Sequence, residues 1–305
     1  MIIDVHTHLG DILSPDGGKL IYHIGVKKQR VLDFISVAEL GLYKTNPVTE
    51  WAFKSLLQDQ VTKAARARNL TATLENFRKS MDDNHVLISA CMPIAPYVTF
   101  CDLKKAAQTD SGIVPFTSFD FSLDQDPTQI LDRDVAEGAK GLKLHPIIQR
   151  EPLFSDKTFK VVEAFGTHRL PVLFHCGVYS YYLGREKKEM QEPAYGSPQD
   201  AVKLCTSFPE VAFIVGHAGL FQYREIIDLF AGRKNVYVDT SFQSPSAIKE
   251  LIRAFGPQRV MYASDWPWGD RKTNIRSVAK ACGGDKSLER LIYYENAARL
   301  LDVST

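Results

Sequence analysis

The sequence has little cysteine, and the cysteines it has form no recognisable pair. Five cysteines, an odd number, are scattered over 305 residues without a Cys-x-x-Cys motif. This pattern favours neither a disulfide framework nor a zinc site built from thiolates. A reducing cytoplasm is therefore the environment that we expect for the chain.

An excess of charge and a long apolar run are also missing. The 37 basic and 36 acidic residues leave a net charge of +1, which gives no electrostatic footprint for nucleic acid or an anionic membrane. No apolar stretch approaches the roughly 20 residues that a membrane-spanning helix needs, and the first residues do not resemble a signal peptide. We expect a soluble protein whose partner is a small molecule.

Eight runs of apolar, strand-forming residues recur along the chain. They cover residues 2–8, 85–92, 113–119, 141–145, 171–175, 211–217, 235–240 and 259–265. Segments of helical spacing separate most of them; Phe159, Val162 and Phe165, for example, follow the fourth run. Strand then helix, repeated eight times, predicts an α/β fold in which a parallel sheet closes into a (β/α)8 TIM barrel. We interpret residues 1–305 as one domain.

The connection between the first two runs is much longer than the others. The spacing of Leu70, Leu74, Phe77 and Met81 predicts the first barrel helix, which leaves residues 9–69 as an insertion after the first strand. The insertion contains the turn-rich stretch LSPDGGK, and we expect a helix over residues 49–68. Insertions of this length are usually functional, so we expect a lid or an interface element.

Four histidines and one aspartate stand where the predicted strands end. His6 and His8 end the first run, His175 the fifth, His217 the sixth and Asp265 the eighth. Each of them alone could be a hydrogen-bonded or capping residue. The carboxyl ends of barrel strands form one rim, however, and active sites are built there, so the five side chains should converge. Strand alternation also predicts that Asp4 shares a face with the first two histidines.

This set of residue types suits a catalytic metal. Imidazole and carboxylate ligands favour zinc, manganese or iron(II). Three histidines and one carboxylate leave a position for water, whose pKa falls towards about 7 on a metal ion. One of the five residues would then be spare, and a histidine within reach of that water is a natural general acid/base.

Seven short motifs follow one another along nearly the whole chain: DVHTHLG, GLKLHP, PVLFHCG, FIVGHAG, YVDTS, VMYASDWP and NAARLL. Together they resemble the amidohydrolase superfamily, in the amidohydrolase-related branch that includes aminocarboxymuconate semialdehyde decarboxylase. The resemblance implies that His6, His8, His175 and Asp265 bind one divalent metal ion, usually zinc, and that His217 is the acid/base. It also implies a (β/α)8 barrel and, often, a dimer, so we expect a homodimer.

The fourth strand leaves an alternative open. Lys143 and His145 share one face of this strand. In two-metal relatives a lysine here becomes carboxylated and bridges both metals, and His217 would then bind the second metal. We favour a single metal, with Lys143 paired to a carboxylate and His145 lining the pocket. Both are candidate substrate-binding residues.

Further substrate contacts are harder to assign. Trp266 and Trp268 follow the rim aspartate directly, so they could offer aromatic surface to a planar substrate or pack against a helix. We take Trp266 as the candidate. Arginines that follow the fourth to sixth strands could meet a substrate carboxylate or remain solvated; they are Arg150, Arg185 and Arg224.

The leading hypothesis from the sequence is a metal-dependent hydrolase of an amide, lactone or similar bond. Asp265 would orient the attacking water, and His217 would move the proton to the leaving group. The alternative is a nonoxidative decarboxylase of a small unsaturated or aromatic acid, in which His217 protonates the carbon that loses carbon dioxide. A barrel that binds without turnover is a third reading, which the intact ligand set disfavours.

Overall fold

The computed structural model describes residues 1–28, 32–37, 48, 51, 56–177, 179–190 and 192–303. The strands are β1 (Ile3–Thr7), β2 (Ile88–Cys91), β3 (Ile113–Pro115), β4 (Leu142–Leu144), β5 (Val172–Phe174), β6 (Phe213–Val215), β7 (Val236–Asp239) and β8 (Val260–Met261). The helices are α1 (Phe34–Val37), α3 (Gln58–Asn69), α4 (Leu74–Asp83), α5 (Phe100–Thr109), α6 (Pro127–Ala136), α7 (Pro146–Gln149), α8 (Asp156–Gly166), α9 (Gly184–Met190), α10 (Pro198–Ser207), α11 (Tyr223–Phe230), α12 (Pro245–Phe255), α13 (Arg271–Cys282), α14 (Lys286–Arg290) and α15 (Asn296–Leu301). Short 3-10 or π turns are η1 (Gly17–Tyr22), η4 (Pro193–Gly196), η5 (Gly216–Gln222), η6 (Pro257–Arg259) and η7 (Leu291–Glu295).

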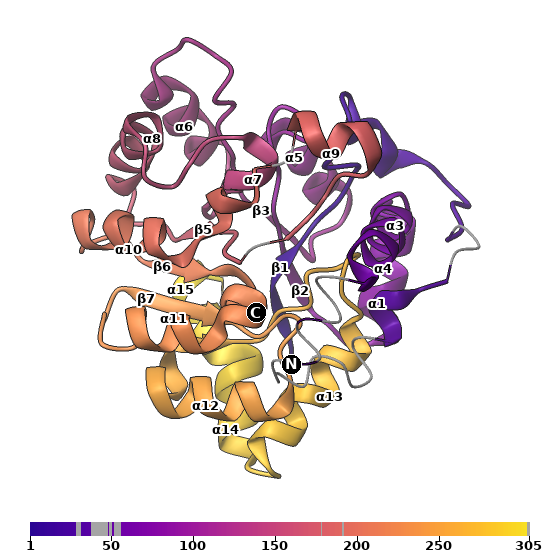
Figure 1. The fold of residues 1–305 in the computed structure, drawn as a ribbon, viewed down its shortest axis with the longest axis vertical. Coiled ribbons are helices and arrows are strands. Elements are labelled where there is room, and N and C mark those ends of the chain that lie inside the picture. Colours follow the sequence, from indigo (N-terminus) through magenta and orange to yellow (C-terminus); the bar gives the residue numbers. More distant parts are fainter. Residues whose placement is uncertain are drawn as a thin grey trace.

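All the strands pair in parallel, in chain order, and they close into a ring. One sheet has the order β1-β2-β3 and the other β4-β5-β6-β7-β8. Parallel bridges join the two sheets on both sides, Thr117 to Leu142 and Thr7 to Trp266. Figure 1 shows helices around this central ring of strands. The (β/α)8 barrel predicted from the sequence is confirmed.

The predicted elements lie where periodicity placed them, and local chemistry accounts for their ends. In α12 the Ser244 side chain accepts a hydrogen bond from Ala247 N, and Pro245 occupies the first turn. Both features favour a helix start, and Gly256 with φ 81° ends the helix. The first barrel helix, expected from Leu70, begins only at Leu74, because Thr73 caps it through a bond from Asn76 N.

The interior of the barrel is apolar at the end opposite the rim that carries the histidines. Side chains from opposite strands meet there, including Ile3, Val5, Leu173, Ile214 and Met261. Helix α15 contributes two further buried residues, Ala297 and Leu301, to the same cluster and contacts both β1 and β8. This end of the barrel is therefore a packed core, and polar chemistry is left to the other end.

Strand β1 departs from regular alternation. Its register with β2 shifts between Asp4 and Thr7. Asp4 forms an ion pair with Arg271 of α13 at 3.1 Å, whereas His6 turns to the rim. The expectation that Asp4 shares a face with His6 is therefore wrong, because the irregularity puts an extra residue between them.

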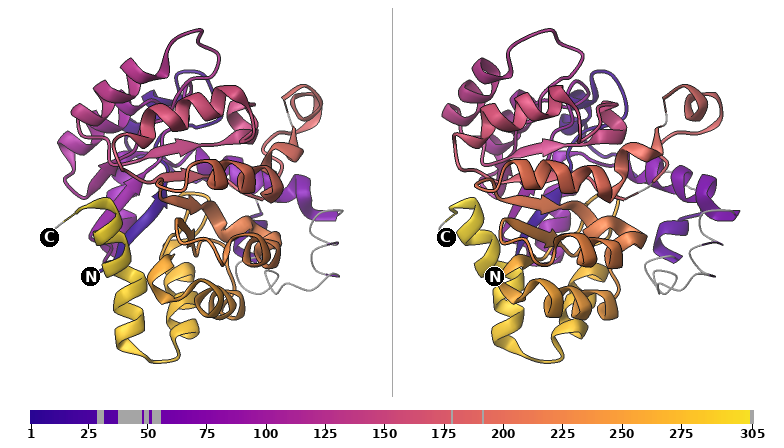
Figure 2. Two further views of the ribbon diagram at one scale, coloured as in Figure 1. Left: turned by 90° about the vertical axis from the view of Figure 1, so that its left-hand side faces the viewer. Right: turned by 60° about the vertical axis from the view of Figure 1, so that its left-hand side comes forward.

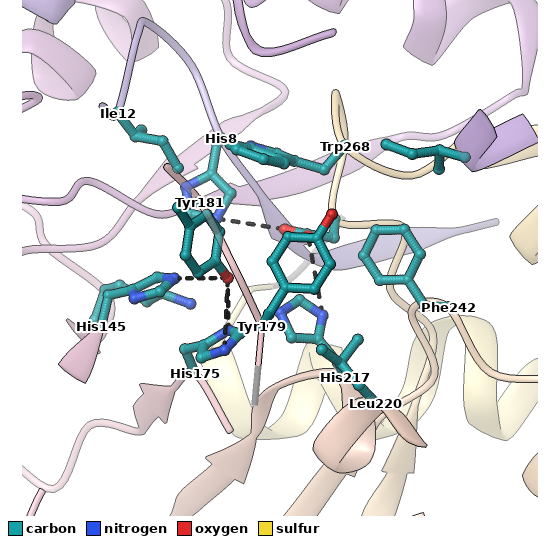
Figure 3. A pocket seen from close by; sticks show the side chains of 13 residues that line it. His8, Ile12, His145, His175, Tyr179, Tyr181, His217, Leu220, Phe242 and Trp268 are labelled. Carbon is teal, nitrogen blue, oxygen red and sulfur yellow. Dashed lines mark hydrogen bonds and ion pairs between the residues drawn. The ribbon is translucent and has the colours of Figure 1, made fainter. Parts of the chain in front are cut away.

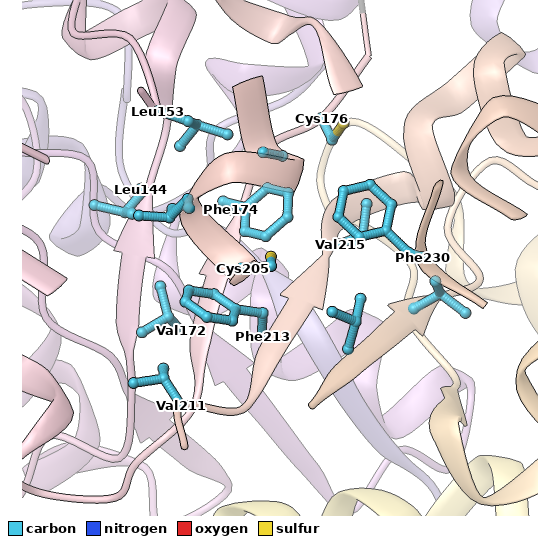
Figure 4. Packing of buried hydrophobic residues seen from close by; sticks show 14 of the residues in the cluster. Leu144, Leu153, Val172, Phe174, Cys176, Cys205, Val211, Phe213, Val215 and Phe230 are labelled. Carbon is cyan, nitrogen blue, oxygen red and sulfur yellow. The ribbon is translucent and has the colours of Figure 1, made fainter. Parts of the chain in front are cut away.

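The outer layer packs helices against the outward faces of the strands. The cluster in Figure 4 joins Val172 and Phe174 of β5 with Phe213 and Val215 of β6 and with Cys205 of α10. These strands are buried on both faces, as parallel strands in barrels are. Burial on both faces explains why their sequences read as continuous apolar runs.

The insertion is partly described. Helix α3 covers the end of the helix expected over residues 49–68; residues 49–50 and 52–55 lie outside the described residues. Both views in Figure 2 show α3 and α9 on the same side of the molecule. The two segments are joined by ion pairs, Arg66 to Glu186 at 2.6 Å and Lys187 to Asp59 at 3.0 Å.

Two features bear on the environment of the chain. Each of the five cysteines is unpaired, and four of them are buried. Among the helices that the structure describes, none is long and apolar enough to cross a membrane.

Candidate active site

Four of the five rim residues selected from the sequence line one cavity at the carboxyl end of the barrel (Figure 3): His8, His175, His217 and Asp265. The fifth, His6, lies against them, with its ring centroid 4.8 Å from that of His217. The cavity encloses about 490 Å³, including the space at its mouth. Its lining residues are His8, Ile12, Ile35, Lys143, His145, His175, Tyr179, Tyr181, His217, Leu220, Phe242, Asp265 and Trp268. Polar groups gather at the floor and aromatic and aliphatic groups form the walls, as in many ligand sites.

Three atoms that can only accept hydrogen bonds converge at this floor. His6 Nδ1 lies 2.8 Å from Asp239 Oδ2, and His8 Nδ1 lies 2.9 Å from Met92 O. Because carboxylate and carbonyl oxygens accept, each Nδ1 carries the hydrogen and each Nε2 keeps a lone pair. Those two Nε2 atoms lie 3.5 Å and 3.4 Å from Asp265 Oδ1.

The carboxylate oxygen at the centre of this group lacks a hydrogen-bond partner within the described part of the chain. Asp265 Oδ1 is buried and accepts no hydrogen bond from the residues that the structure describes. A buried acceptor normally has a partner, and an unpaired one indicates a missing ion or water. Two imidazole lone pairs and one carboxylate around a common point fit a divalent cation such as zinc, manganese or iron(II).

The backbone holds Asp265 firmly in place. Its main chain has the left-handed φ of 56°, which is uncommon for any residue except glycine. Asp265 N donates to His6 O at 2.8 Å, and Gly269 N donates to Asp265 O at 3.0 Å. These bonds join the end of β1 to the loop after β8, so barrel closure itself sets the position of the carboxylate relative to His6.

Burial keeps the histidines in the form that binds metals. The pKa values of His6, His8 and His217 are well below the ordinary value of 6.5, chiefly because burial disfavours the charged ring. Burial likewise raises the pKa of Asp265 well above its usual range, against the opposing effect of Lys143. A cation at the floor would relieve this penalty by pairing with the carboxylate.

His175 lines the cavity but is oriented differently from the first two histidines. Its Nε2 lies 3.0 Å from Gly177 O, and its Nδ1 lies 3.3 Å from the Tyr181 hydroxyl. Burial lowers its pKa to about 3. The ring stacks on His145 with centroids 4.3 Å apart. His175 as a ligand stays a prediction, and it would require the ring to exchange these contacts for the cation.

His217 lies on the other side of the same group. One ligand atom from each of His6, His217 and Asp265 lies within 4.8 Å of the others. His217 Nδ1 is 2.8 Å from Ser241 Oγ and 3.9 Å from Asp265 Oδ2. This position is close enough for a proton-transfer group beside a cation, and also for a ligand of a second one.

Lys143 lies beneath the histidines, fully buried, with Nζ 2.9 Å from His6 Nε2. Burial lowers its pKa to about 8, although Asp265 and Asp239 act in the opposite direction. The ammonium can donate to the lone pair of His6. The prediction that Lys143 faces the site therefore agrees with its position, while its carboxylation and its contact with substrate stay predictions.

The structure corrects the position of one aromatic residue. Trp266 is not among the cavity-lining residues; its ring meets Phe77 of α4 edge-on at 5.1 Å and lies under the Arg271 guanidinium. Trp268, and not Trp266, lines the cavity wall. Because the backbone at Asp265 is left-handed, Trp266 points away from the cavity, whereas Trp268 points into it. Arg150, Arg185 and Arg224 are exposed and line no part of this cavity.

Sequence reasoning missed the groups that surround the rim histidines. Asp239, at the end of β7, bonds to both His6 and the main chain of His217. The rule applied to the other strands, that the polar residue ending a strand belongs to the site, would have selected it from YVDTS. Tyr179 and Tyr181 follow β5 in a segment without regular spacing, and no comparable signal marks them.

The family model described as Amidohydrolase matches residues 3–303. The chain belongs to the amidohydrolase family. No curated protein matches the chain.

Several solved structures have a fold similar to that of this chain. The 5-carboxyvanillate decarboxylase of Novosphingobium aromaticivorans, complexed with manganese and 4-hydroxy-3-methoxy-5-nitrobenzoic acid, has a TM-score of 0.66 and 16% identity, covering 99% of this chain and 96% of that one. The 2,6-dihydroxybenzoate decarboxylase from Rhizobium has a TM-score of 0.66, 14% identity, and coverage of 99% and 98%. A probable 2-pyrone-4,6-dicarboxylic acid hydrolase from Acinetobacter baumannii has a TM-score of 0.59, 13% identity, and coverage of 99% of both chains. At these identities the likeness concerns the fold.

Proposed function

We propose that this amidohydrolase is a metal-dependent, nonoxidative decarboxylase of a small aromatic or unsaturated carboxylic acid. The observation that carries the proposal is the build of the cavity, in which flat aromatic walls stand over a floor that fits a cation. Tyr179, Tyr181, Phe242 and Trp268 form those walls. A planar acid could stack between them while its carboxylate reaches the floor.

The neighbours of similar fold support this choice over hydrolysis, which the sequence favoured first. Two of the structures named above are decarboxylases of substituted benzoates, and one was obtained with manganese. The cation proposed here is a single divalent ion held by His6, His8, His175 and Asp265, with zinc or manganese as the candidates. When bound, it would anchor the substrate carboxylate and stabilise negative charge.

In the proposed reaction, one residue of the chain, His217, transfers a proton to the substrate. His217 Nε2 takes up one proton from solvent and passes it to the substrate carbon that carries the carboxylate. The bond to the carboxylate breaks, its electron pair returns to the ring, and carbon dioxide leaves. Because burial holds the pKa of His217 well below 6.5, the protonated ring is a strong acid once formed. The aromatic walls exclude water from the reacting carbon.

Hydrolysis of a lactone or amide is the second candidate, because one neighbour of similar fold is a probable hydrolase of a pyrone dicarboxylic acid. That substrate carries two carboxylates. Among the lining residues that the structure describes, Lys143 is the only lysine or arginine. Its ammonium already lies 2.9 Å from His6 Nε2, so the described lining offers a second carboxylate no other lysine or arginine, which favours a monocarboxylic substrate.

The two candidates differ in what they release. Hydroxylated benzoates and unsaturated acids should yield one carbon dioxide per product when incubated with protein loaded with manganese or zinc. A decarboxylase adds a solvent hydrogen to the product carbon and incorporates no solvent oxygen. Incorporation of labelled solvent oxygen into the product, without carbon dioxide, would establish the hydrolase instead. A cytoplasmic location remains a prediction.

A further inference from the structure

His217 stands at the start of an unusual stretch of backbone. His217, Ala218, Gly219 and Leu220 have consecutive φ values of 58°, 43°, 80° and 55°. Residues other than glycine rarely adopt this left-handed conformation, and they keep it only where neighbouring contacts enforce it. The contacts that hold this turn therefore bear on the position of His217.

Three polar side chains at alternating positions, beginning at the last residue of β7, make those contacts. Asp239 Oδ1 accepts from His217 N at 3.0 Å. Gln243 Nε2 donates to His217 O at 2.6 Å and to Leu220 O at 3.0 Å. Ser241 Oγ lies 2.8 Å from the ring nitrogen Nδ1. All three are buried, and we name Asp239, Ser241 and Gln243 the β7 clamp.

Hydrogen counting determines which ring nitrogen of His217 carries the proton. Ser241 Oγ donates its single hydrogen to Asp239 Oδ1 at 2.6 Å, since a carboxylate only accepts. The same hydroxyl must then accept from His217 Nδ1–H. The neutral ring consequently has its hydrogen on Nδ1 and a lone pair on Nε2, the nitrogen that Ser241 leaves unbonded.

The same carboxylate orients a second histidine. Asp239 Oδ2 accepts from His6 Nδ1 at 2.8 Å, which leaves the lone pair of His6 Nε2 for the floor of the site. Partners of this kind fix ring orientation and tautomer around metal sites. One aspartate on β7 thus contacts both His6 of β1 and His217, which follows β6.

We propose that Asp239 and Ser241 are positioning residues, which fix His217 with Nε2 towards the substrate and His6 with Nε2 towards the cation. Their contribution to catalysis rests on the function proposed above for His217, whereas the tautomers they impose do not. If the β7 clamp served only to hold the backbone turn, removing the Ser241 hydroxyl would not change the tautomer of the His217 ring.

The tautomer can be measured directly in the metal-free protein. We would label histidine rings with 15N, correlate ring nitrogens with ring protons by NMR, and assign His217 with a His217→Asn variant. Wild-type protein should show His217 protonated on Nδ1. Ser241→Ala should move His217 towards a mixture of tautomers, while Ser241→Thr, which keeps the hydroxyl, should preserve the wild-type signal.

A matched control lies one residue away. Thr240 is also buried, but its hydroxyl accepts from Ala263 N and does not touch His217. Thr240→Val should leave the His217 signals unchanged. Unchanged signals from the other histidines would show that each variant is folded. A His217 protonated on Nε2 in wild type, or unaffected by Ser241→Ala, would overturn the proposal.

Kinetics test the catalytic part separately. With an accepted acid as substrate, Ser241→Ala should lower kcat about 10–100-fold, the range for partners of this kind, with KM and bound metal unchanged. Ser241→Thr should recover most of the loss. If Ser241→Ala shifts the tautomer but leaves kcat intact, positioning for catalysis is refuted. If no acid is turned over by wild type, the proposed function fails while the tautomer result still decides the assignment.

Discussion

At the scale of single residues, the direction of each hydrogen bond decides what a side chain can offer a ligand. His6 and His8 give their Nδ1 hydrogens to Asp239 and Met92, so each has one lone pair left, and both lone pairs face Asp265. These three acceptors repel one another, and in the described part of the chain only His6 Nε2 among them has a nearby donor, Lys143 Nζ at 2.9 Å. A cation is the natural partner that turns this arrangement from unfavourable to favourable.

Asp265 is the residue whose replacement tests this interpretation most simply. Asp265→Asn removes the negative charge and should weaken cation binding by at least about 100-fold, since even the partners behind metal ligands contribute about 10–100-fold. Metal content measured by mass spectrometry after gel filtration should fall to a small fraction of wild type. Asp270→Asn, which alters the cap of α13 and leaves the cavity lining unchanged, should retain full content. Equal content in Asp265→Asn would contradict the site.

His175 makes the stability of the metal-free protein depend on pH. Its pKa is about 3 in the folded chain and about 6.5 when unfolded. Between these two values the unfolded chain binds a proton at His175, whereas the folded chain does not. The contribution of His175 to the free energy of unfolding is therefore full above pH 6.5 and is lost as the pH falls towards 3. Between pH 6.5 and 5 this slope should approach about 1.4 kcal/mol per pH unit.

The comparison of wild type with His175→Gln isolates that contribution, because other titrating groups such as Asp265 are common to both proteins. Urea unfolding at several pH values should show a shallower pH dependence in the variant. Parallel curves for the two proteins would mean that His175 becomes charged in the folded state.

At the scale of elements, a buried ion pair holds the seam where the barrel closes. Asp4 of β1 accepts from Arg271 Nε at 3.1 Å and from Ser264 N at 2.9 Å, while Arg271 lies over the Phe77 ring at 4.7 Å. Both charged groups are fully buried. Their attraction stabilises the fold only as a pair, since either charge alone would be left without water or a partner.

Asp4→Asn should therefore lower the free energy of unfolding by about 3–5 kcal/mol. The double variant Asp4→Leu with Arg271→Met should lose much less than the sum of the single changes, because it leaves no lone charge. Denaturant unfolding of all the variants would measure the coupling. Additive losses would show that the two groups do not depend on each other.

The segment carrying the wall tyrosines depends on α3 of the insertion. Thr62 Oγ1 donates to Ser180 O at 2.9 Å in a buried contact, between Tyr179 and Tyr181. Thr62→Val should remove about 1 kcal/mol from local stability and raise hydrogen exchange in residues 179–190 about fivefold. Arg66→Gln, which breaks the more exposed pair with Glu186, should have a smaller effect. Equal protection in Thr62→Val and wild type would refute the role of this contact.

At the scale of the whole molecule, the homodimer remains a prediction, and the insertion is where we propose the contact. Large apolar side chains are exposed there, namely Ile24, Leu32, Val48, Trp51 and Leu56. Light scattering should give twice the chain mass of 34.3 kDa, and Trp51→Glu should shift the protein towards the monomer. A monomer at every concentration of wild type would contradict the proposal.

The sequence was most informative where a strand ended in a polar residue. Parallel strands in a barrel deliver their last residues to one rim, so His6, His217 and Asp265 could be placed together from strand ends alone. Alternation failed at Asp4 because a register shift in β1 depends on pairing with β2, which no local pattern reveals. Trp266, the aromatic candidate from the sequence, packs outside the cavity and Trp268 lines it, because the left-handed backbone at Asp265 changes the direction of the loop.

Other parts of the site depend on tertiary contacts that periodicity does not encode. Ser241 matters through a hydrogen bond to a histidine that lies 24 residues away in sequence. Tyr181 reaches His145 and His175 from an irregular segment held in place by the insertion. Such contacts are set by how loops pack on a finished barrel, which is a property of the whole chain.

The most direct measurement is anomalous diffraction from crystals grown with manganese or zinc, recorded above and below the absorption edge of the metal. We expect one peak at the floor of the cavity, about 2.0–2.2 Å from His6 Nε2, His8 Nε2 and an Asp265 oxygen. A fully loaded crystal with no peak among these three side chains would contradict the central claim.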